Sequence, residues 1–576
     1  MLGDLLITFN PVKEPWKTRS NQPWQLAHDF GLAQVWTNEP DETWRGFPVA
    51  TFEDDRWVIW ALGEFFGTQP TWPASLEDPN SLNGHFLVLA YQKQIKQWHV
   101  ITNRLGTMHV YASRGSGSTA ISTFSPAVAS AVGDRSLDWS AIGGFLKFGF
   151  FLGENTYWQN TRVISPATHL VMDEEGAVVS NTRYWQWHYE PDLRLSPKAA
   201  VEEFSKIFKD VLLETVNKKK LALPLSGGLD SRSTLAVLGR PDLDRDQTLF
   251  PFSYGYAENS VETKIARELA EKRNLPIKTW SIKPYLFEKI DRIVSSVEGF
   301  QDITQCRQAF VIDDLSHVSD YVMAAHWGDV WLDSMGFIGQ TLPSRAEMSQ
   351  EIIHKYQKKG SENLLALFED VLPANFNESI QAEIDTSLEG FGAVQEKDFM
   401  VKAWKTAQWS HRWTLASIRM YQAGLFPMLP FYDNRLVDFF LRVPSDFMIQ
   451  RKLQIEYIKQ VAPDLAKVCW QPYNANLYNY KHFNSWLLPQ RAANKLGRLM
   501  RNEKIIQRNW EVQFLNPQGR AGVNQWLLEA GLKLHDFVSL TVIQLLLGEF
   551  YDHPQGANGY AVSMLLTLSA WLEKYG

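Results

Sequence analysis

The stretch Leu221-Ala222-Leu223-Pro224-Leu225-Ser226-Gly227-Gly228-Leu229-Asp230-Ser231 decides how this chain is interpreted. Its first five residues predict a buried strand, the next five predict a turn, and Ser231 begins a predicted helix that continues to Leu238. A loop between a strand and a helix presents backbone N–H groups and the positive end of the helix dipole to an anion. Gly227 and Gly228 carry no side chains, so an anion can approach this backbone closely.

The polar residues of the loop suit a nucleotide phosphate and its metal ion. Ser226 and Ser231 have hydroxyls that donate to phosphate oxygens, and Asp230 can hold the magnesium that neutralises them. The alternative is a tight turn in which Asp230 and Ser231 only cap the helix. Because the complete Ser-Gly-Gly-Leu-Asp-Ser string follows an apolar strand, we favour the nucleotide interpretation. The expected ATP-binding residues are Leu225, Ser226, Gly227, Gly228, Asp230 and Ser231.

The segments around the loop alternate between apolar runs and helical stretches. Further apolar runs occur at 249–254, 277–282 and 321–325. Such alternation is typical of βαβ units and predicts a parallel sheet. Ser196-Pro197 is a helix start signal and marks the beginning of this unit, and the chain is predicted to be mostly helical from about residue 400 onward.

Residues 1–190 predict a different, strand-rich unit. The short apolar runs 86–91 and 98–102 are separated by a polar stretch, which suits a β-hairpin. The predicted fold class is therefore α/β, with two domains at residues 1–190 and 191–576 and a helical C-terminal part.

Composition limits the classes of partner. With 57 Lys and Arg against 64 Asp and Glu, the net charge of -7 gives no basic field for a nucleic-acid backbone. Cys306 and Cys469 are the two cysteines of the chain, which excludes a disulfide framework and suits a reducing cytosol. The first residues lack a signal-peptide pattern, and the apolar run 562–572 is shorter than the ~20 residues of a membrane span. We expect a cytoplasmic protein with no nucleic-acid or membrane partner.

Taken with three further segments, the loop resembles that of the asparagine synthetase family. Phe252-Ser253-Tyr254-Gly255 is similar to that family's next strand, which borders the adenine. Asp302-Ile303-Thr304-Gln305-Cys306-Arg307 matches its Asp-x-Thr-x-x-Arg pattern, and Pro430-Phe431-Tyr432-Asp433 is similar to its Pro-Phe-Leu-Asp. The resemblance implies an Ntn-hydrolase-like α+β sandwich of the glutamine amidotransferase type, followed by a doubly wound parallel-sheet ATP pyrophosphatase domain. It adds Tyr254, Gly255 and Ala324 to the expected ATP-binding residues.

A second carboxylate is expected, because one carboxylate seldom fixes magnesium between phosphates. Ala325-His326-Trp327-Gly328-Asp329 follows a predicted strand and resembles the loop with the family's other metal ligand. Asp230 and Asp329 are therefore the expected magnesium ligands, with a solvated loop acid or cap as the alternative for Asp329. His326 stands where the family has Glu, and a neutral imidazole there can accept a proton from an attacking amine. His326 is the expected catalytic residue, with a packed loop histidine as the equal alternative.

The chain departs from the family in two further places. Glutamine-dependent members use the Cys after the initiator Met as nucleophile, whereas Leu2 occupies that position, so no ammonia release from glutamine is expected. The lysine that stabilises the adenylate in several members has no convincing counterpart in 467–472, so Lys467 or a basic residue from elsewhere is the alternative for this role. A basic stretch is interpreted as a solvated face or as a dock for an acidic carrier or peptide. It comprises Arg491, Lys495, Arg498, Arg501, Lys504 and Arg508.

These features predict an ATP-dependent ligase that activates a carboxylate as an acyl-adenylate, releases pyrophosphate and forms an amide with an amine or ammonia. The expected cofactors are ATP and Mg²⁺, and the expected partners are a small-molecule or peptide carboxylate and an amine. Loss of the nucleophile resembles β-lactam synthetases and lasso-peptide cyclases, so an intramolecular cyclase is one alternative. A non-catalytic homologue that binds a nucleotide or a partner is another, and a homodimer or a carrier partner stays open. Asp242-Leu243-Asp244 resembles a glycosyltransferase metal pair but lies in a polar turn.

Overall fold

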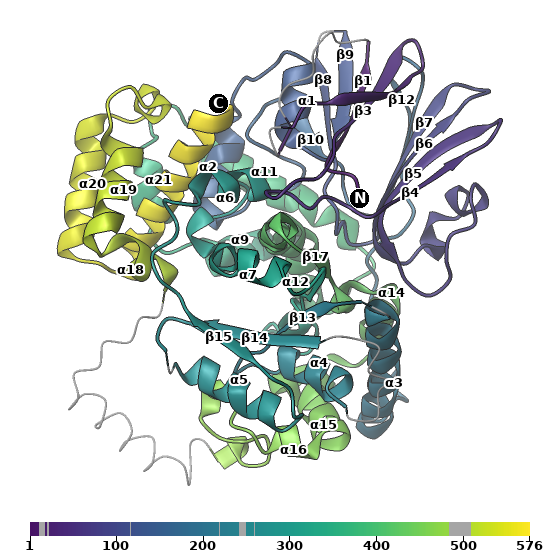
Figure 1. Cartoon of the computed structure of the whole chain (residues 1–576), viewed down its shortest axis with the longest axis vertical. Coiled ribbons are helices and arrows are strands. Elements are labelled where there is room, and N and C mark those ends of the chain that lie inside the picture. Colours follow the sequence, from purple (N-terminus) through teal and green to yellow (C-terminus); the bar gives the residue numbers. More distant parts are fainter. Residues whose placement is uncertain are drawn as a thin grey trace.

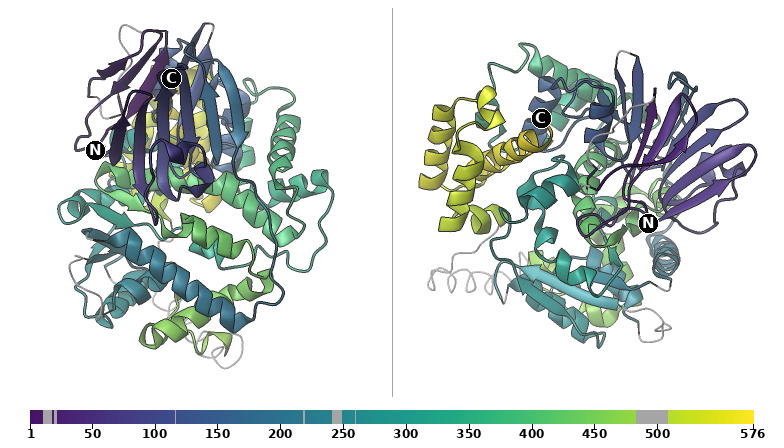
Figure 2. Two further views of the ribbon diagram at one scale, coloured as in Figure 1. Left: turned by 90° about the vertical axis from the view of Figure 1, so that its right-hand side faces the viewer. Right: turned by 45° about the horizontal axis from the view of Figure 1, so that its top comes forward.

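The computed structural model describes eight ranges of the chain, namely 1–10, 18–19, 22–115, 117–217, 219–240, 249–258, 260–482 and 508–576. Two six-stranded antiparallel sheets make up the N-terminal part, and a five-stranded parallel sheet follows. The antiparallel sheets lie at the opposite end of the molecule from the parallel sheet, with helices between them (Figures 1 and 2). The chain is therefore a mixed α/β protein, as predicted.

The two antiparallel sheets face each other across a core of large aromatic side chains. Their strand orders are β10-β8-β9-β1-β3-β2 and β12-β11-β7-β6-β5-β4. Phe9 of the first sheet meets Trp98 of the second at 5.9 Å between ring centroids, and both are buried. The predicted hairpin is confirmed, because β6 and β7 pair in antiparallel register. The strands are β1 (Leu5–Phe9), β2 (Gln25–Asp29), β3 (Ala33–Thr37), β4 (Val49–Glu53), β5 (Trp57–Phe65), β6 (Gly84–Gln92), β7 (Gln97–Thr102), β8 (Tyr111–Gly115), β9 (Ser118–Ser122), β10 (Thr161–Val163), β11 (Thr168–Met172) and β12 (Val178–Arg183).

The parallel sheet has the strand order β15-β14-β13-β16-β17. Starting from β13, the chain adds β14 and β15 on one side and then β16 and β17 on the other. Ligands of open α/β sheets bind at the carboxyl ends of the strands where the order reverses, which here lies between β13 and β16. The strands are β13 (Leu221–Pro224), β14 (Leu249–Gly255), β15 (Lys278–Ser281), β16 (Tyr321–Met323) and β17 (Phe426–Met428).

The sequence prediction of this sheet missed one strand. β17 falls in the region that was predicted to be mostly helical, and it has only three residues. Pro427 lies within it and donates no hydrogen bond, which an edge position tolerates. So short a strand has no periodicity of its own to reveal it.

Helices surround the parallel sheet and form the C-terminal part. The predicted start at Ser196-Pro197 is confirmed, because Ser196 Oγ caps α3 by accepting from Ala199 N–H at 3.2 Å. Around the sheet lie α3 (Pro197–Val216), α4 (Asp230–Leu238), α5 (Val261–Glu271), α6 (Ile290–Val297), α8 (Gly328–Trp331), α12 (Lys397–Lys405), α14 (Asn434–Phe440) and α15 (Lys452–Val461). The last helices are α18 (Asn509–Phe514), α19 (Pro517–Leu528), α20 (Leu540–Asp552) and α21 (Gly556–Tyr575), which gather at one side of the molecule (Figure 1).

Three sequence predictions are compared with the described residues only in part. Within the described ranges, no helix is long and apolar enough to cross a membrane. Of the basic stretch, only Arg508 belongs to the described residues, and it precedes α18. The segment Asp242-Leu243-Asp244, which was predicted to be a turn, lies outside the described residues.

Candidate active site

The loop after β13 folds as a tight strand-to-helix turn, with the helix beginning at Asp230, one residue earlier than predicted. Ser226 N–H donates to Ser231 Oγ at 3.1 Å, and the two serine hydroxyl oxygens lie 3.0 Å apart. Gly228 N–H donates to Ser226 Oγ at 3.2 Å. The side chains expected to bind phosphate therefore lie together at the N-terminus of α4.

A distant segment covers one side of this loop. A Cβ on Gly227 would lie 2.4 Å from Gln471 Oε1, and Gln471 N–H donates to the Gly227 carbonyl at 3.2 Å. The guanidinium of Arg232 holds this segment by donating to the carbonyls of Val468 at 3.0 Å and Cys469 at 2.7 Å. Gly227 is therefore required by the close approach of Gln471, which the sequence did not single out.

The loop after β16 touches Asp230 directly. A Cβ on Gly328 would lie 2.8 Å from Asp230 Cγ, so the side chain of Asp230 lies against the backbone of Gly328. Trp327 precedes it with φ +79°, a conformation that non-glycine residues rarely adopt. Asp329 follows and is exposed. The structure thus places both expected magnesium ligands on loops in contact, where the strand order reverses.

Asp230 experiences opposing electrostatic effects. Burial raises the pKa of its carboxyl, the Arg451 guanidinium lowers that pKa, and the Asp329 carboxylate raises it. Arg451 forms an ion pair with Asp230 Oδ1, and Gln454 Nε2 donates to the same oxygen at 3.0 Å. Arg451 has φ +61° and follows Gln450 with φ +55°. The sequence did not identify Arg451 as a site residue. Basic residues next to the first turn of a helix are too common for this position to stand out.

The oxygen ligands of this site suit magnesium that is bound together with a substrate phosphate. They do not suit a metal ion that is held by protein side chains alone. Mg²⁺ takes oxygen ligands and is commonly bound by one or two carboxylates together with substrate phosphates. Asp230 and Asp329 supply two carboxylates, and both described contacts of Asp230 with Arg451 and Gln454 use Oδ1. In the described part of the chain, no group of three or more His, Cys, Asp or Glu side chains could hold a metal ion. The two aspartates would hold magnesium together with phosphate oxygens.

His326 and Lys405 lie near Asp329. Burial lowers the pKa of His326, which the Asp329 carboxylate opposes, and Nδ1 has no hydrogen-bond partner among the described residues. A neutral imidazole with a free ring nitrogen can accept a proton. Burial also lowers the pKa of Lys405, again opposed by Asp329, and its ammonium lies 5.4 Å from the ring centroid of Trp327. Lys405 is a basic residue from elsewhere in the chain, which the sequence alone did not single out.

The other predicted nucleotide residues occupy neighbouring strand ends. Tyr254 is the second-to-last residue of β14 and lies beneath the guanidinium of Arg307, which is 5.7 Å from its ring centroid. Burial alone would lower the pKa of Arg307, but Tyr254, Tyr256 and Glu262 raise it overall. A Cβ on Gly255 would lie 2.1 Å from Ser260 Oγ, and Ala324 N–H donates to the Met428 carbonyl at 2.9 Å. Arg307 is the member of its predicted motif that reaches this region.

The remaining acids of the matched motifs make structural contacts. Asp302 Oδ1 accepts from Thr304 N–H at 2.9 Å and from its hydroxyl at 2.6 Å, which caps a short helical turn. Asp433 caps α14 and accepts from Asn83 Nδ2 of the N-terminal part at 3.1 Å. Neither acid points to a reaction.

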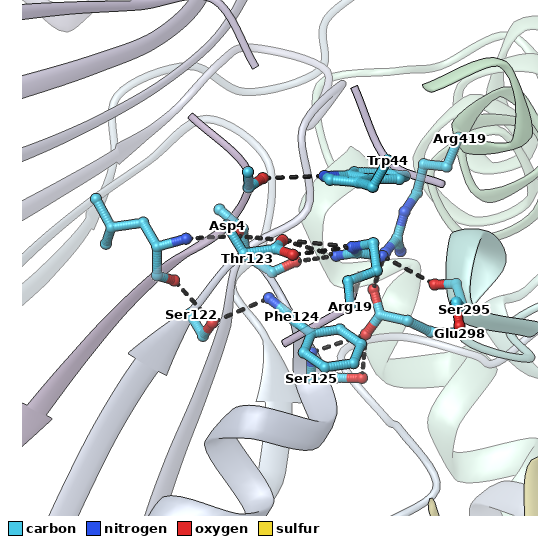
Figure 3. Close-up of polar contacts among 12 residues, drawn as sticks. Asp4, Arg19, Trp44, Ser122, Thr123, Phe124, Ser125, Ser295, Glu298 and Arg419 are labelled. Atoms are coloured by element: carbon cyan, nitrogen blue, oxygen red, sulfur yellow. Dashed lines mark hydrogen bonds and ion pairs between the residues drawn. The ribbon is translucent and has the colours of Figure 1, made fainter. Parts of the chain in front are cut away.

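The chain start is tied into a structural network. Leu2 exchanges backbone hydrogen bonds with Phe47 at 2.8 and 2.7 Å. Two residues on, Asp4 accepts from the Thr123 hydroxyl at 2.9 Å and pairs with Arg19 at 3.2 Å (Figure 3). Arg19 also pairs with Glu298 at 2.8 Å, and Arg419 pairs with Glu298 as well (Figure 3). We call Asp4, Arg19, Glu298 and Arg419 the Glu298 clamp, because they join the sandwich to the second part.

Comparisons with known proteins add little to this geometry. No family model matches the chain. No curated protein matches it. Among solved structures, one titled "Structure of the allosteric regulatory enzyme of purine biosynthesis" matches with 8% identity over 50% of this chain and 76% of that chain, at a TM-score of 0.19. Since a TM-score this low supports no argument, the resemblance to the asparagine synthetase family stays a prediction.

Proposed function

We propose that this chain is a carbon–nitrogen ligase that uses magnesium-ATP to activate a carboxylate as an acyl-adenylate. An amine or ammonia then displaces AMP to form an amide, and pyrophosphate is released in the first step. The observation that carries the proposal is the contact of two loops, Ser226–Ser231 and His326–Asp329, where the strand order reverses. Ligands of open α/β sheets bind at this position.

The residues of the two loops suit distinct tasks in that reaction. Backbone N–H groups and hydroxyls at the N-terminus of α4 favour a bound phosphate. Asp230 and Asp329 would hold magnesium, which supplies positive charge to neutralise the phosphates. Neutral His326 accepts the proton that the amine loses on attack. Lys405 and Arg307 are two cations that would stabilise negative charge near the reacting atoms.

The proposal extends to both parts of the chain. Residues 1–190 would be an Ntn-hydrolase-like sandwich of the amidotransferase type without its reaction, because Leu2 replaces the nucleophile. Residues 191–576 would be the doubly wound ATP pyrophosphatase domain of an asparagine synthetase-like enzyme. An amine within the same substrate would make the enzyme a cyclase, of the type found in β-lactam synthetases and lasso-peptide cyclases.

A second candidate function is nucleotide binding without turnover. The ion pair between Arg451 and Asp230 favours it, because this pair partly neutralises one of the two expected metal ligands. In that case magnesium-ATP would bind, but no carboxylate and amine mixture would release pyrophosphate.

A pyrophosphate-release assay with carboxylate and amine mixtures tests the proposal. We expect Asp230→Asn to lose at least about 100-fold in rate, a loss typical of removing one preorganised electrostatic contact. Asp55→Asn, an exposed aspartate of the sandwich, is the matched control and should behave as wild type. Calorimetric titration with magnesium-ATP shows whether a nucleotide binds, which both candidates require, and pyrophosphate release then separates the ligase from the binder. Equal pyrophosphate release by wild type and Asp230→Asn would refute the ligase.

A further inference from the structure

Two lysines share one tryptophan ring next to the candidate active site. Lys405 is the last residue of α12, and Lys358 lies two residues after α9 (Arg345–Tyr356). The Lys358 ammonium lies 4.1 Å from the ring centroid of Trp409, and the Lys405 ammonium lies 5.4 Å from the same centroid. All three side chains are partly exposed, so a ligand can reach them from solvent. We call Lys358, Lys405 and Trp409 the two-lysine site.

The surrounding backbone fixes the direction of these side chains. Trp409 belongs to a π-helical segment, Thr406–Thr414, that directly follows Lys405. π-Helical turns are rare and occur frequently at functional sites. A Cβ on Gly149 would lie 3.3 Å from Lys358 Cε, so the aliphatic part of Lys358 packs against Gly149 while its ammonium lies over Trp409. Lys358 is therefore held in position before a ligand binds.

Positive charge is not balanced at the two-lysine site. Within the described ranges, neither ammonium forms a side-chain hydrogen bond or an ion pair. Burial lowers the pKa of Lys358, and the cations Lys405 and Arg508 lower it as well, to about 8. Asp302 is the carboxylate that opposes this shift, and its Oδ1 already accepts two hydrogen bonds from Thr304. A bound anion would offset the repulsion among these cations.

A short series of contacts connects the two-lysine site to the candidate active site. The Lys405 ammonium lies 5.4 Å from the ring centroid of Trp327. Trp327 directly precedes Gly328, whose backbone lies against the side chain of Asp230. Lys405 is therefore next to the loop that carries Asp329.

Lys358 lies farther from that loop than Lys405 does. The Asp329 carboxylate acts on the pKa of Lys405 but is not among the groups that act on Lys358. Asp230, at the phosphate loop, is acted on by a different cation, Arg451. An anion at Lys358 would therefore be separate from the ATP phosphates. It would lie at the far end of a substrate whose reacting carboxylate is near Asp329.

We propose that Lys358 binds a phosphate group at the far end of the carboxylate substrate, with Lys405 between this group and the reacting carboxylate. The substrate class is then a phosphorylated acid. The cations at this site match the two negative charges of a phosphomonoester better than the single charge of a second carboxylate, and lysine binds phosphate as a point charge. That this anion belongs to the acid substrate rests on the proposed function, whereas the presence of an anion site does not.

Two adjacent lysines provide a matched pair of variants. Lys358→Met removes the proposed phosphate ligand, and Lys359→Met removes the exposed positive charge next to it in the chain. Because Lys358 forms no ion pair with a described residue, we expect Lys358→Met to melt at no lower temperature than wild type. Calorimetry on the full chain would use 3-phosphoglycerate as probe and glycerate as the same acid without the phosphate. Both titrations would be repeated with magnesium and α,β-methylene-ATP, which cannot release pyrophosphate.

The proposal predicts that wild type and Lys359→Met bind 3-phosphoglycerate more tightly than glycerate, with or without the nucleotide. Lys358→Met should bind 3-phosphoglycerate at least about tenfold more weakly than wild type, equal to about 1.4 kcal/mol. Equal binding of the two acids by wild type, no binding of 3-phosphoglycerate, or equal binding by the two variants would each overturn it. Displacement of 3-phosphoglycerate by α,β-methylene-ATP would also overturn it, because the phosphate would then occupy the nucleotide site.

The pyrophosphate assay separates failure of this site from failure of the ligase. With a phosphorylated acid as substrate, Lys358→Met should raise KM for the acid and leave KM for ATP unchanged. An unchanged KM for the acid would overturn the assignment of the anion to the acid substrate. If no mixture releases pyrophosphate while Lys358→Met still loses 3-phosphoglycerate, the ligase fails and the anion site stands.

Discussion

Two groups of charged side chains, each drawn from distant parts of the chain, differ in how completely their charges are paired. In the Glu298 clamp, the side chains of Asp4, Arg19 and Glu298 are at most 1% exposed. At the candidate active site, Asp230 is 20% exposed on its side chain and has an unfavourable neighbour in Asp329. The clamp is built for stability, whereas the loops around Asp230 keep charges that the protein alone does not balance.

The contacts of Glu298 explain the contrast. One carboxylate oxygen, Oε1, takes the guanidinium groups of Arg19 and Arg419. The other, Oε2, accepts from Ser125 N–H at 2.7 Å and from the Ser125 hydroxyl (Figure 3). A buried charge is tolerated when all of its ion-pair and hydrogen-bond partners are present. Removing one partner leaves the remaining charges buried without a counter-charge. By contrast, His326 Nδ1 at the candidate site has no partner among the described residues.

Glu298→Gln should have the largest effect on the free energy of unfolding. It keeps the shape of the side chain but leaves Arg19 and Arg419 without their shared carboxylate. We expect a loss on the order of 3–5 kcal/mol, the usual cost of breaking a buried pair. Chemical denaturation with a far-UV circular dichroism readout would measure it.

An exposed pair provides the control for that measurement. Lys93 and Glu53 are paired at 2.8 Å, with side chains 30% and 57% exposed. Glu53→Gln should cost about 0–1 kcal/mol and less at high salt. If Glu298→Gln loses no more than this control, the clamp does not stabilise the protein.

The second test removes Arg451 and follows the pH dependence of the candidate site. Arg451 lowers the pKa of Asp230, so Arg451→Met should raise that pKa, and the carboxylate should then be protonated at higher pH. We expect the acid limb of pyrophosphate release, and of magnesium-ATP binding, to move up by about one pH unit. Arg451→Lys keeps the charge and should shift it less. An unmoved acid limb in Arg451→Met would show that Asp230 does not bind the metal.

The sequence predicted the local features of the fold and of the site. The strand, loop and helix around Ser226 were found because an apolar run, two glycines and an acid in the first helical turn are adjacent in the chain. The parallel sheet followed from the spacing of the apolar runs. Asp329 was placed near Asp230 only through a family resemblance, and the structure brings their loops together.

Contacts between residues that are far apart in the chain have no corresponding pattern in the sequence. Arg19 and Glu298 are 279 residues apart, and Arg451 and Asp230 are 221 apart, so no periodicity relates them. Gln471 over Gly227 and the two-lysine site depend likewise on how separate segments pack. Side-chain pairing across a fold is decided by tertiary packing, which a single sequence does not display.

The smallest expected effect is that of Asp230→Asn on stability, which is the direct counterpart of Glu298→Gln. Burial and Asp329 raise the folded-state pKa of Asp230 despite Arg451. Because the folded-state pKa is raised, stability is lost as pH rises from about 3.9, the ordinary pKa of an aspartate, through the folded-state pKa. The ionised carboxylate therefore destabilises the folded protein at neutral pH. The uncharged asparagine side chain removes this destabilising charge, and it also weakens the hydrogen bonds to Arg451 and Gln454.

These two consequences oppose each other, so we expect Asp230→Asn to change the free energy of unfolding by less than about 1 kcal/mol at pH 7, or to increase it. Denaturation of wild type, Asp230→Asn and Glu298→Gln under one condition would measure the difference. At pH 3, where an aspartyl group in the unfolded chain is largely protonated, wild type and Asp230→Asn should differ less. A loss of about 3 kcal/mol in Asp230→Asn would place Asp230 with the clamp, as a structural acid, and would remove the contrast between the two regions.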